Sequence, residues 1–296
     1  MRLKPSRLRA RASKPDGMQL GLGSYACAWA IGGVPGYPNP AQPLDAVGLI
    51  ERAVRLGLRL VQIADNLPLE QYSAVTLETI RAAAFENGVA LELGTRGIAP
   101  AHLSRLVDLC AFFNSRLLRV VTDIHEHKPA PAEIVSVVRE ALGHLRAAGV
   151  TLAIENHDRL PVSTLADIME QIADPAVGIC LDTANSFGAL EGPEIVINTL
   201  APYVVNIHVK DFMIRRAAHM MGFAITGTPA GEGQLNIPSL LRQLRGSSRH
   251  PNAILELWPP PETDYAATVA KEERWCQSSV RYLRRFVPES YHEEQT

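Results

Sequence analysis

Short apolar runs alternate with longer amphipathic segments along most of the chain. Each run is rich in valine, isoleucine and leucine, which is typical of a strand buried on both faces. The eight runs are residues 18–25, 58–64, 90–96, 117–122, 151–156, 177–182, 204–211 and 253–258. A single run also fits a buried piece of helix, but eight in succession, each followed by an amphipathic segment, favour strands.

The intervening segments carry helix signals. Residues 45–57, 69–88 and 131–149 each end in a glycine, which often terminates a helix because it adopts the left-handed conformation. The first of these segments has apolar residues spaced three or four positions apart, as one face of a helix requires. Pro161 and Pro238 lie near two further expected helix starts, where a missing N–H is tolerated.

Eight alternating strand and helix units, with no hairpin signal between strands, predict a parallel α/β sheet. We expect it to close into a single (β/α)8 TIM barrel over residues 17–287, because a doubly wound open sheet commonly has fewer strands. Residues 1–16 and 288–296 are assigned to tails. The longest interval, 211–236, contains a glycine-rich GTPAGEG and is expected to be a lid or a binding loop.

Four polar residues lie near the carboxyl ends of the last four runs: Glu155, Asp182, His208 and Glu256. Such side chains are costly to bury unless something pairs with them. In a barrel these strand ends form the active face, and neighbouring strands lie only ~4.8 Å apart. One shared divalent cation therefore explains all four residues.

The chemistry of these donors narrows the choice of ion. Three carboxylates and one imidazole suit Mn²⁺ or Mg²⁺ better than a structural zinc site, which favours cysteine and histidine. Co²⁺ or Zn²⁺ are possible substitutes. The alternative to a metal site is a set of buried ion pairs with Lys210, Arg96 or Arg119.

Further polar residues are expected around the ion. Lys210 shares a strand face with His208 and is assigned to acid–base catalysis or to a substrate oxygen; a salt bridge with Asp211 or Glu232 is the alternative. His157 and Asn185 are assigned to substrate binding, although His157 also fits a loop cap.

The first half of the barrel supplies three more candidates at the same rim, namely Trp29, Asn66 and Arg96. Arg96 suits a substrate carboxylate or phosphate or, alternatively, an interior ion pair, and Trp29 suits a pocket wall or ordinary packing. Glu92 and Arg119 are expected to point into the barrel and to pair there.

Charge and cysteine content exclude several classes of protein. The net charge is −2, so no global field attracts nucleic acid or an anionic membrane. No apolar run approaches the ~20 residues of a membrane helix.

The four cysteines form no CxxC pair, which indicates a reducing compartment and a cytoplasmic location. The first 14 residues hold six basic and no acidic residues, which fits a disordered tail or an organelle-targeting segment.

Four short motifs resemble the metal-ligand motifs of the xylose isomerase-like barrel superfamily. They are IEN at 154–156, LDTAN at 181–185, IHVKD at 207–211 and LEL at 255–257. The resemblance covers residues 18–286. Known members include sugar isomerases and epimerases, dehydratases, decarboxylases such as those acting on 3-oxo-isoapionate, and endonuclease IV.

For the epimerases the resemblance implies that Glu155 and Glu256 bind the metal and each moves a proton, through a metal-stabilised enediolate. A metal-dependent sugar isomerase or epimerase is therefore the first hypothesis. Asn185 replaces a histidine that epimerases often carry, and the Lys210-Asp211 pair looks more like the dehydratase and decarboxylase branches. A lyase acting on an oxo-sugar acid or an inosose is accordingly the close alternative.

Two further hypotheses concern other partners. Endonuclease IV needs extra histidines that the second and third runs lack, which argues against nucleic acid as a partner. A sugar-binding barrel without catalysis is expected to lose a metal ligand, and none is lost. The expected partner is a small carbohydrate or sugar acid, without nucleic acid or membrane, and related barrels suggest a homo-oligomer.

Overall fold

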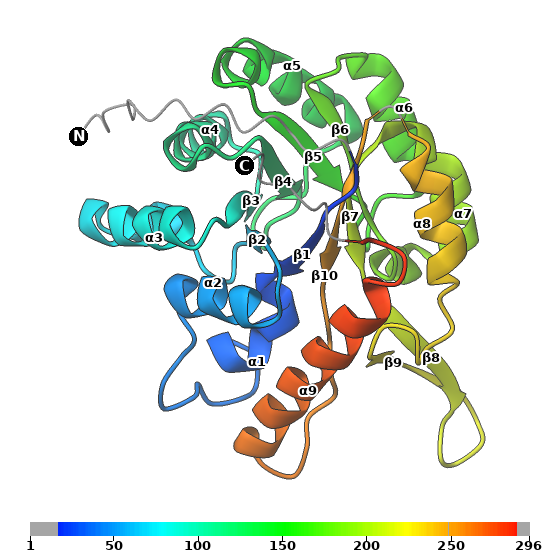
Figure 1. The fold of residues 1–296 in the computed structure, drawn as a ribbon. Helices are drawn as coiled ribbons and strands as arrows, with labels where there is room; N and C mark the ends of the chain where they lie inside the picture. The colour runs from blue at the N-terminus through cyan, green and yellow to red at the C-terminus, as the bar shows by residue number, and fades with distance from the viewer. Residues whose placement is uncertain (1–16, 248, 289–296) are drawn as a thin grey trace.

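The computed structural model describes residues 17–247 and 249–288, and they form a closed eight-stranded parallel barrel surrounded by helices (Figure 1). The strands follow the order β1-β10-β7-β6-β5-β4-β3-β2 around the barrel. They are β1 (Leu20–Gly23), β2 (Leu60–Ile63), β3 (Ala90–Arg96), β4 (Leu117–Val121), β5 (Thr151–Glu155), β6 (Val177–Asp182), β7 (Val204–Val209) and β10 (Asn252–Leu255). The predicted TIM barrel is confirmed. Of the two predicted tails, residues 1–16 and 289–296 lie outside the described residues.

Helices fill most of the connections between the strands. They are α1 (Ala28–Ile31), α2 (Ala46–Arg55), α3 (Ala74–Glu86), α4 (Pro100–Phe113), α5 (Pro131–Ala148), α6 (Val162–Ile172), α7 (Pro193–Leu200), α8 (Ile237–Arg245) and α9 (Tyr265–Leu283). Gly149 follows α5 with a φ of 67°, so the expected glycine cap is present. Within the described ranges, no helix combines the length and apolar character that crossing a membrane requires.

Polar side chains occupy part of the barrel interior. The buried carboxylate of Glu92 accepts hydrogen bonds from the amides of Gln62 (3.1 Å), Asn206 (2.9 Å) and Asn252 (2.7 Å). Arg119 forms ion pairs with Asp65 and Glu155, which lie nearer the active face. The barrel therefore has a lower amide-rich layer and an upper charged layer.

The segment predicted as a long loop contains a hairpin, so that prediction is wrong. Strands β8 (Asp211–Arg216) and β9 (Phe223–Thr228) pair in an antiparallel sheet that projects beyond the barrel (Figure 1). Ile214 lies opposite Ile225. Neither strand, with the sequences DFMIRR and FAITGT, alternates apolar and polar residues, so the chain carries no period-2 signal for this hairpin.

The carboxylate of Asp211 anchors the base of this hairpin. It accepts hydrogen bonds from the backbone N–H groups of Phe212, Gly231, Gly233 and Leu235, at 2.8 to 3.1 Å. A Cβ atom on Gly233 would lie 2.1 Å from Asp211 Oδ1, so only glycine allows this approach. The segment after β9 is thereby held against the barrel directly beside Lys210.

Helix α9 holds the connection that follows β1. Glu272, which is fully buried, accepts hydrogen bonds from the N–H groups of Trp29 (2.8 Å) and Ala30 (3.0 Å). Tyr265 donates a hydrogen bond to the carbonyl oxygen of Trp29 at 2.6 Å. Burial raises the pKa of Glu272 to about 7, although the two N–H groups oppose the shift.

This raised pKa predicts a pH-dependent stability. Between pH 4.5, the ordinary pKa of the group, and pH 7, the unfolded chain loses the Glu272 proton while the folded chain retains it. The free energy of unfolding should therefore fall as pH rises through this window, by at most about 3 kcal/mol. Urea unfolding at several pH values measures the slope.

Glu272→Gln should flatten this slope, because the titrating group is gone. Glu86→Gln, which changes an exposed carboxylate on α3, is the matched control and should keep the wild-type slope. Equal slopes in Glu272→Gln and wild type would contradict the assignment.

Candidate metal and substrate site

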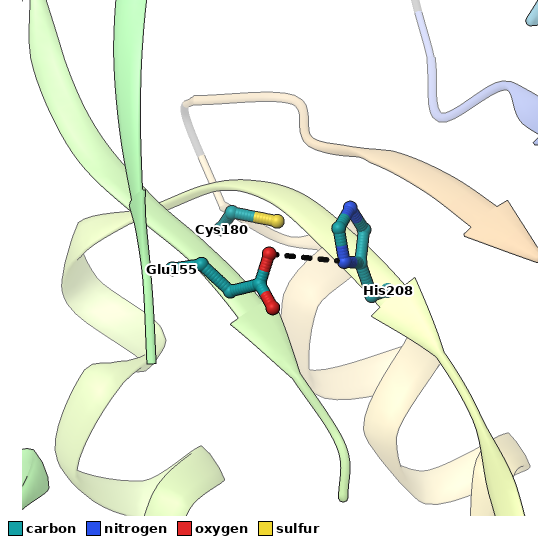
Figure 2. Close-up of side chains that lie close together, drawn as sticks. All are labelled: Glu155, Cys180 and His208. Carbon is teal, nitrogen blue, oxygen red and sulfur yellow. Dashed lines mark ion pairs between the residues drawn. The ribbon is translucent and has the colours of Figure 1, made fainter. Parts of the chain in front are cut away.

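The four candidate metal ligands meet at the carboxyl ends of β5, β6, β7 and β10, and each is at most 3% exposed. Nδ1 of His208 lies 3.4 Å from Glu155 Oε2, 3.6 Å from Asp182 Oδ2 and 3.3 Å from Glu256 Oε1. Figure 2 shows the carboxylate of Glu155 facing the His208 ring. The structure thus brings together four residues that are far apart in the sequence.

The hydrogen bonds of Gln62 determine which nitrogen of His208 faces the carboxylates. The Gln62 amide nitrogen donates to Glu92 and Asn206, so its oxygen points to His208 Nε2, 2.6 Å away. Because an amide oxygen only accepts, Nε2 of His208 carries a hydrogen. Nδ1 therefore faces the three carboxylates, where it can hold either a proton or a metal ion.

This arrangement fits a divalent cation. Among the described residues no hydrogen bond reaches Nδ1 of His208 or Oε1 of Glu256, and both atoms are buried. A lone pair surrounded by carboxylate oxygens is unfavourable unless a positive charge lies between them. The nearby carboxylates raise the pKa of His208 against the effect of burial, so a proton and a metal ion compete for Nδ1.

Lys210 lies next to the candidate metal ligands. Its ammonium nitrogen is 2.7 Å from Asp182 Oδ2, 2.9 Å from Glu256 Oε2 and 3.4 Å from Asn185 Oδ1. These carboxylates, rather than Asp211 or Glu232, are its ion-pair partners. Burial works to lower the pKa of Lys210, but the charges of Asp182 and Glu256 outweigh it and raise the pKa. Lys210 is therefore a cation next to the candidate metal ligands.

Both oxygens of Glu155 have partners. Oε2 contacts Nε of Arg119, and Oε1 accepts a hydrogen bond of 2.7 Å from the amide of Asn185. Burial would raise the pKa of Glu155, but the charge of Arg119 more than compensates and lowers it. Carboxylate oxygens have further lone pairs, so Glu155 can still bind a cation, but it is a weaker base than an unpaired carboxylate.

Asp65 links this centre to the rim of the barrel. Its carboxylate binds Arg119 NH1 at 2.9 Å and Arg96 Nε at 3.1 Å, and it accepts a hydrogen bond of 2.9 Å from the hydroxyl of Tyr25. Arg96 NH2 in turn lies 3.2 Å from Nε2 of His157. Two predicted substrate-binding residues, Arg96 and His157, are thereby brought together.

Two other predicted residues have partners away from the four ligands. Trp29 is 6% exposed, donates to the carbonyl oxygen of Pro259 at 3.0 Å and packs edge-on against Tyr37 and Tyr265. Asn66 accepts a hydrogen bond of 2.6 Å from Ser24. The contacts of Trp29 correspond to the packing alternative.

Sequence reasoning missed the residues that hold the site in place. Gln62 orients His208, Asp65 joins two arginines, and Asn156 binds both backbone groups of Asp182, at 2.7 and 2.9 Å. A polar residue inside an apolar run, as in the sequence LVQI, was an available signal for Gln62. Asp65 follows its strand by two residues and carries no such signal.

Comparison with known proteins identifies the family. Residues 50–286 match the xylose isomerase-like TIM barrel family. The chain belongs to this family. The resemblance drawn from the four sequence motifs is therefore confirmed.

Individual relatives of this xylose isomerase-like barrel differ in their reactions. The chain is 33% identical over 266 residues to a 3-oxo-isoapionate decarboxylase of Pectobacterium atrosepticum, covering 90% of this chain and 95% of that protein. A D-psicose 3-epimerase of Clostridium cellulolyticum H10, solved with D-tagatose, has a TM-score of 0.69 at 15% identity and covers 91% and 99% of the two chains.

A third relative was solved with a metal ion. This xylose isomerase-like barrel protein of Mycobacterium smegmatis, in complex with magnesium, has a TM-score of 0.63 at 15% identity, over 90% and 97% of the two chains. At this identity both solved structures show a shared fold only.

The role of Gln62 predicts a change in metal affinity. Gln62→Leu removes the acceptor that orients His208, and the affinity for Mn²⁺ should fall by about 10- to 100-fold. Titration calorimetry on the metal-free protein measures the change. Gln171→Leu, at an exposed position on α6, is the control, and an affinity within twofold of wild type in Gln62→Leu would exclude the orienting role.

Proposed function

We propose that this protein is a metal-dependent lyase that decarboxylates a small 3-oxo sugar acid. The observation that carries the proposal is the ammonium group of Lys210, which lies between two candidate metal ligands, Asp182 and Glu256. The decarboxylase relative, which aligns with 90% of the chain, supports the same reaction.

The four candidate ligands, Glu155, Asp182, His208 and Glu256, would hold the ion. When bound, the ion supplies positive charge that stabilises the negative charge developing on a substrate oxygen. Asn185 bonds to Glu155 and lies near Lys210, so it helps to keep these two side chains in place.

The charge balance of the site favours an anionic substrate. Four carboxylates and three cations contribute to it, namely Glu155, Asp182, Glu256 and Asp65, with Arg119, Lys210 and Arg96. Together they leave one net negative charge, which a divalent ion converts into one net positive charge. A single substrate carboxylate would restore neutrality, whereas a neutral ketose would leave the charge uncompensated.

Arg96 and His157 are the residues that would bind the substrate carboxylate. The side chain of Arg96 is 36% exposed, and Asp65, its ion-pair partner, also pairs with Arg119. Arg96 therefore retains donors for an incoming anion. His157, in the segment after β5, contacts Arg96 through its Nε2 atom.

The reaction breaks the bond between the carboxyl carbon and the adjacent carbon. The electron pair moves to the 3-oxo group and gives an enolate, while CO₂ leaves. Lys210 then donates a proton to the carbon that lost CO₂ and recovers one from water. Glu155 takes no part in proton transfer in this scheme, in keeping with its contacts to Arg119 and Asn185.

Isomerisation or epimerisation is the second candidate. It is favoured by Glu155 and Glu256, whose carboxylates both approach Nδ1 of His208, at 3.4 and 3.3 Å. Two carboxylates on one centre are what proton transfer on two faces of a sugar requires. The contact between Arg119 and Glu155 weighs against it, because it reduces the basicity of one of the two groups.

Incubation with substrates in deuterated water separates the two reactions. With Mn²⁺ and a 3-oxo sugar acid, NMR should show released bicarbonate and one deuterium at the former carboxyl-bearing carbon. Lys210→Met should slow this reaction by about 10²- to 10⁴-fold while Mn²⁺ still binds. New epimers from a neutral ketose, without bicarbonate, would instead support the isomerase.

Arg96→Met tests the substrate-binding assignment. Loss of a charged hydrogen-bond donor should lower kcat/KM for the acid by about 10- to 100-fold, chiefly through KM. Arg159→Met removes another rim arginine, which pairs with Asp123, and should leave kcat/KM near the wild-type value. An unchanged KM in Arg96→Met would return Arg96 to a structural role.

A further inference from the structure

Cys180 lies directly below the candidate metal ligands. It precedes Asp182 by two residues on β6, so both side chains point to the same side of the strand, and it is in register with Glu155 on β5. It is fully buried. Figure 2 shows its sulfur beside the carboxylate of Glu155 and the ring of His208.

Two overlapping groups of donors share His208. Ligand atoms of Glu155, Cys180 and His208 lie within 4.8 Å of one another, and so do those of Asp182, His208 and Glu256. The second group has only oxygen and nitrogen donors, whereas the first adds a sulfur. Nδ1 of His208, buried and without a hydrogen bond in the described chain, is the independent sign that a cation belongs here.

The thiol of Cys180 donates a weak hydrogen bond to Asn206. Its sulfur is 3.4 Å from Oδ1 of Asn206, and an S–H group is a weak donor. A thiolate is by contrast a strong ligand for soft ions, with Zn–S and Zn–N distances of about 2.3 and 2.1 Å. Three donors within 4.8 Å of one another can converge on one such ion.

We propose that Cys180 gives this centre a second, deeper binding mode for a thiophilic divalent ion such as Zn²⁺ or Cd²⁺. The ion binds the sulfur of Cys180 together with Glu155 and His208, and the thiol proton passes to solvent. Because His208 serves both groups, the thiophilic ion and the harder Mn²⁺ or Mg²⁺ exclude each other.

Charge balance supports this mode. A Cys180 thiolate and the carboxylates of Glu155, Asp182 and Glu256 carry four negative charges, which Arg119, Lys210 and a divalent ion neutralise. With a neutral thiol, the same buried cluster has one positive charge in excess. A buried cluster gains most from full neutralisation, so the thiolate is the favoured partner of a soft ion.

Cadmium binding tests the proposal without reference to turnover, so its outcome is independent of the proposed reaction. Metal-free protein titrated with Cd²⁺ should bind one ion per chain and develop the ultraviolet absorption of a sulfur–cadmium bond. Cys180→Ser should lose this absorption and bind Cd²⁺ at least about tenfold more weakly. Its affinity for Mn²⁺, measured by electron paramagnetic resonance, should stay within twofold of wild type.

Cys110→Ser is the matched control, because it changes another fully buried thiol whose sulfur contacts the carbonyl oxygen of Leu117. It should keep both the absorption and the affinity. If Cys180→Ser folds poorly, Cys180→Ala and the ¹¹³Cd resonance of the wild-type protein decide the question. A ¹¹³Cd shift typical of oxygen and nitrogen donors alone, or Cd²⁺ and Mn²⁺ bound together, would overturn the proposal.

Discussion

The buried Nδ1 atom of His208, which faces three carboxylates, is the constraint on which the site depends. Gln62 fixes the hydrogen of His208 on the opposite nitrogen, and the barrel places three carboxylates within 3.6 Å of the remaining lone pair. This arrangement is unfavourable in a folded interior without a positive charge. The positive charge can come from a proton, from the side chains of Lys210 and Arg119, or from a metal ion.

The barrel architecture makes such a concentration of charge tolerable. Parallel strands bring their carboxyl ends to one face, and the amide-rich layer below holds Gln62 and Asn206 through the carboxylate of Glu92. The charged layer is therefore fixed by hydrogen bonds rather than by packing alone. Cys180 lies below the charged layer, close to Glu155 and His208. In the proposed second binding mode, the centre therefore offers a sulfur donor below its oxygen donors.

The contacts of two residues bear on the choice between the reactions of related barrels. Glu155 forms an ion pair with Arg119. The charge of Arg119 lowers the pKa of Glu155 and makes it a weaker base. Lys210 is held between two carboxylates, which raise its pKa and keep it protonated beside the candidate metal ligands. A solved epimerase of the same fold shows that the scaffold hosts other chemistry, so the reaction depends on these side chains and not on the fold.

The sequence alone determined the barrel and the candidate ligands. Eight apolar runs with amphipathic segments between them allow few alternatives, and polar residues at buried strand ends stand out against an apolar background. The hairpin after β7 was missed because neither of its strands alternates apolar and polar residues.

Only the tertiary structure decided which polar groups pair. Arg119 binds Asp65 and Glu155, and Lys210 binds residues on β6 and after β10 rather than its sequence neighbour. Side-chain pairing across a closed barrel depends on the relative register and rotation of several strands. No local pattern of residues encodes these quantities, so the sequence names the charged residues but not their partners.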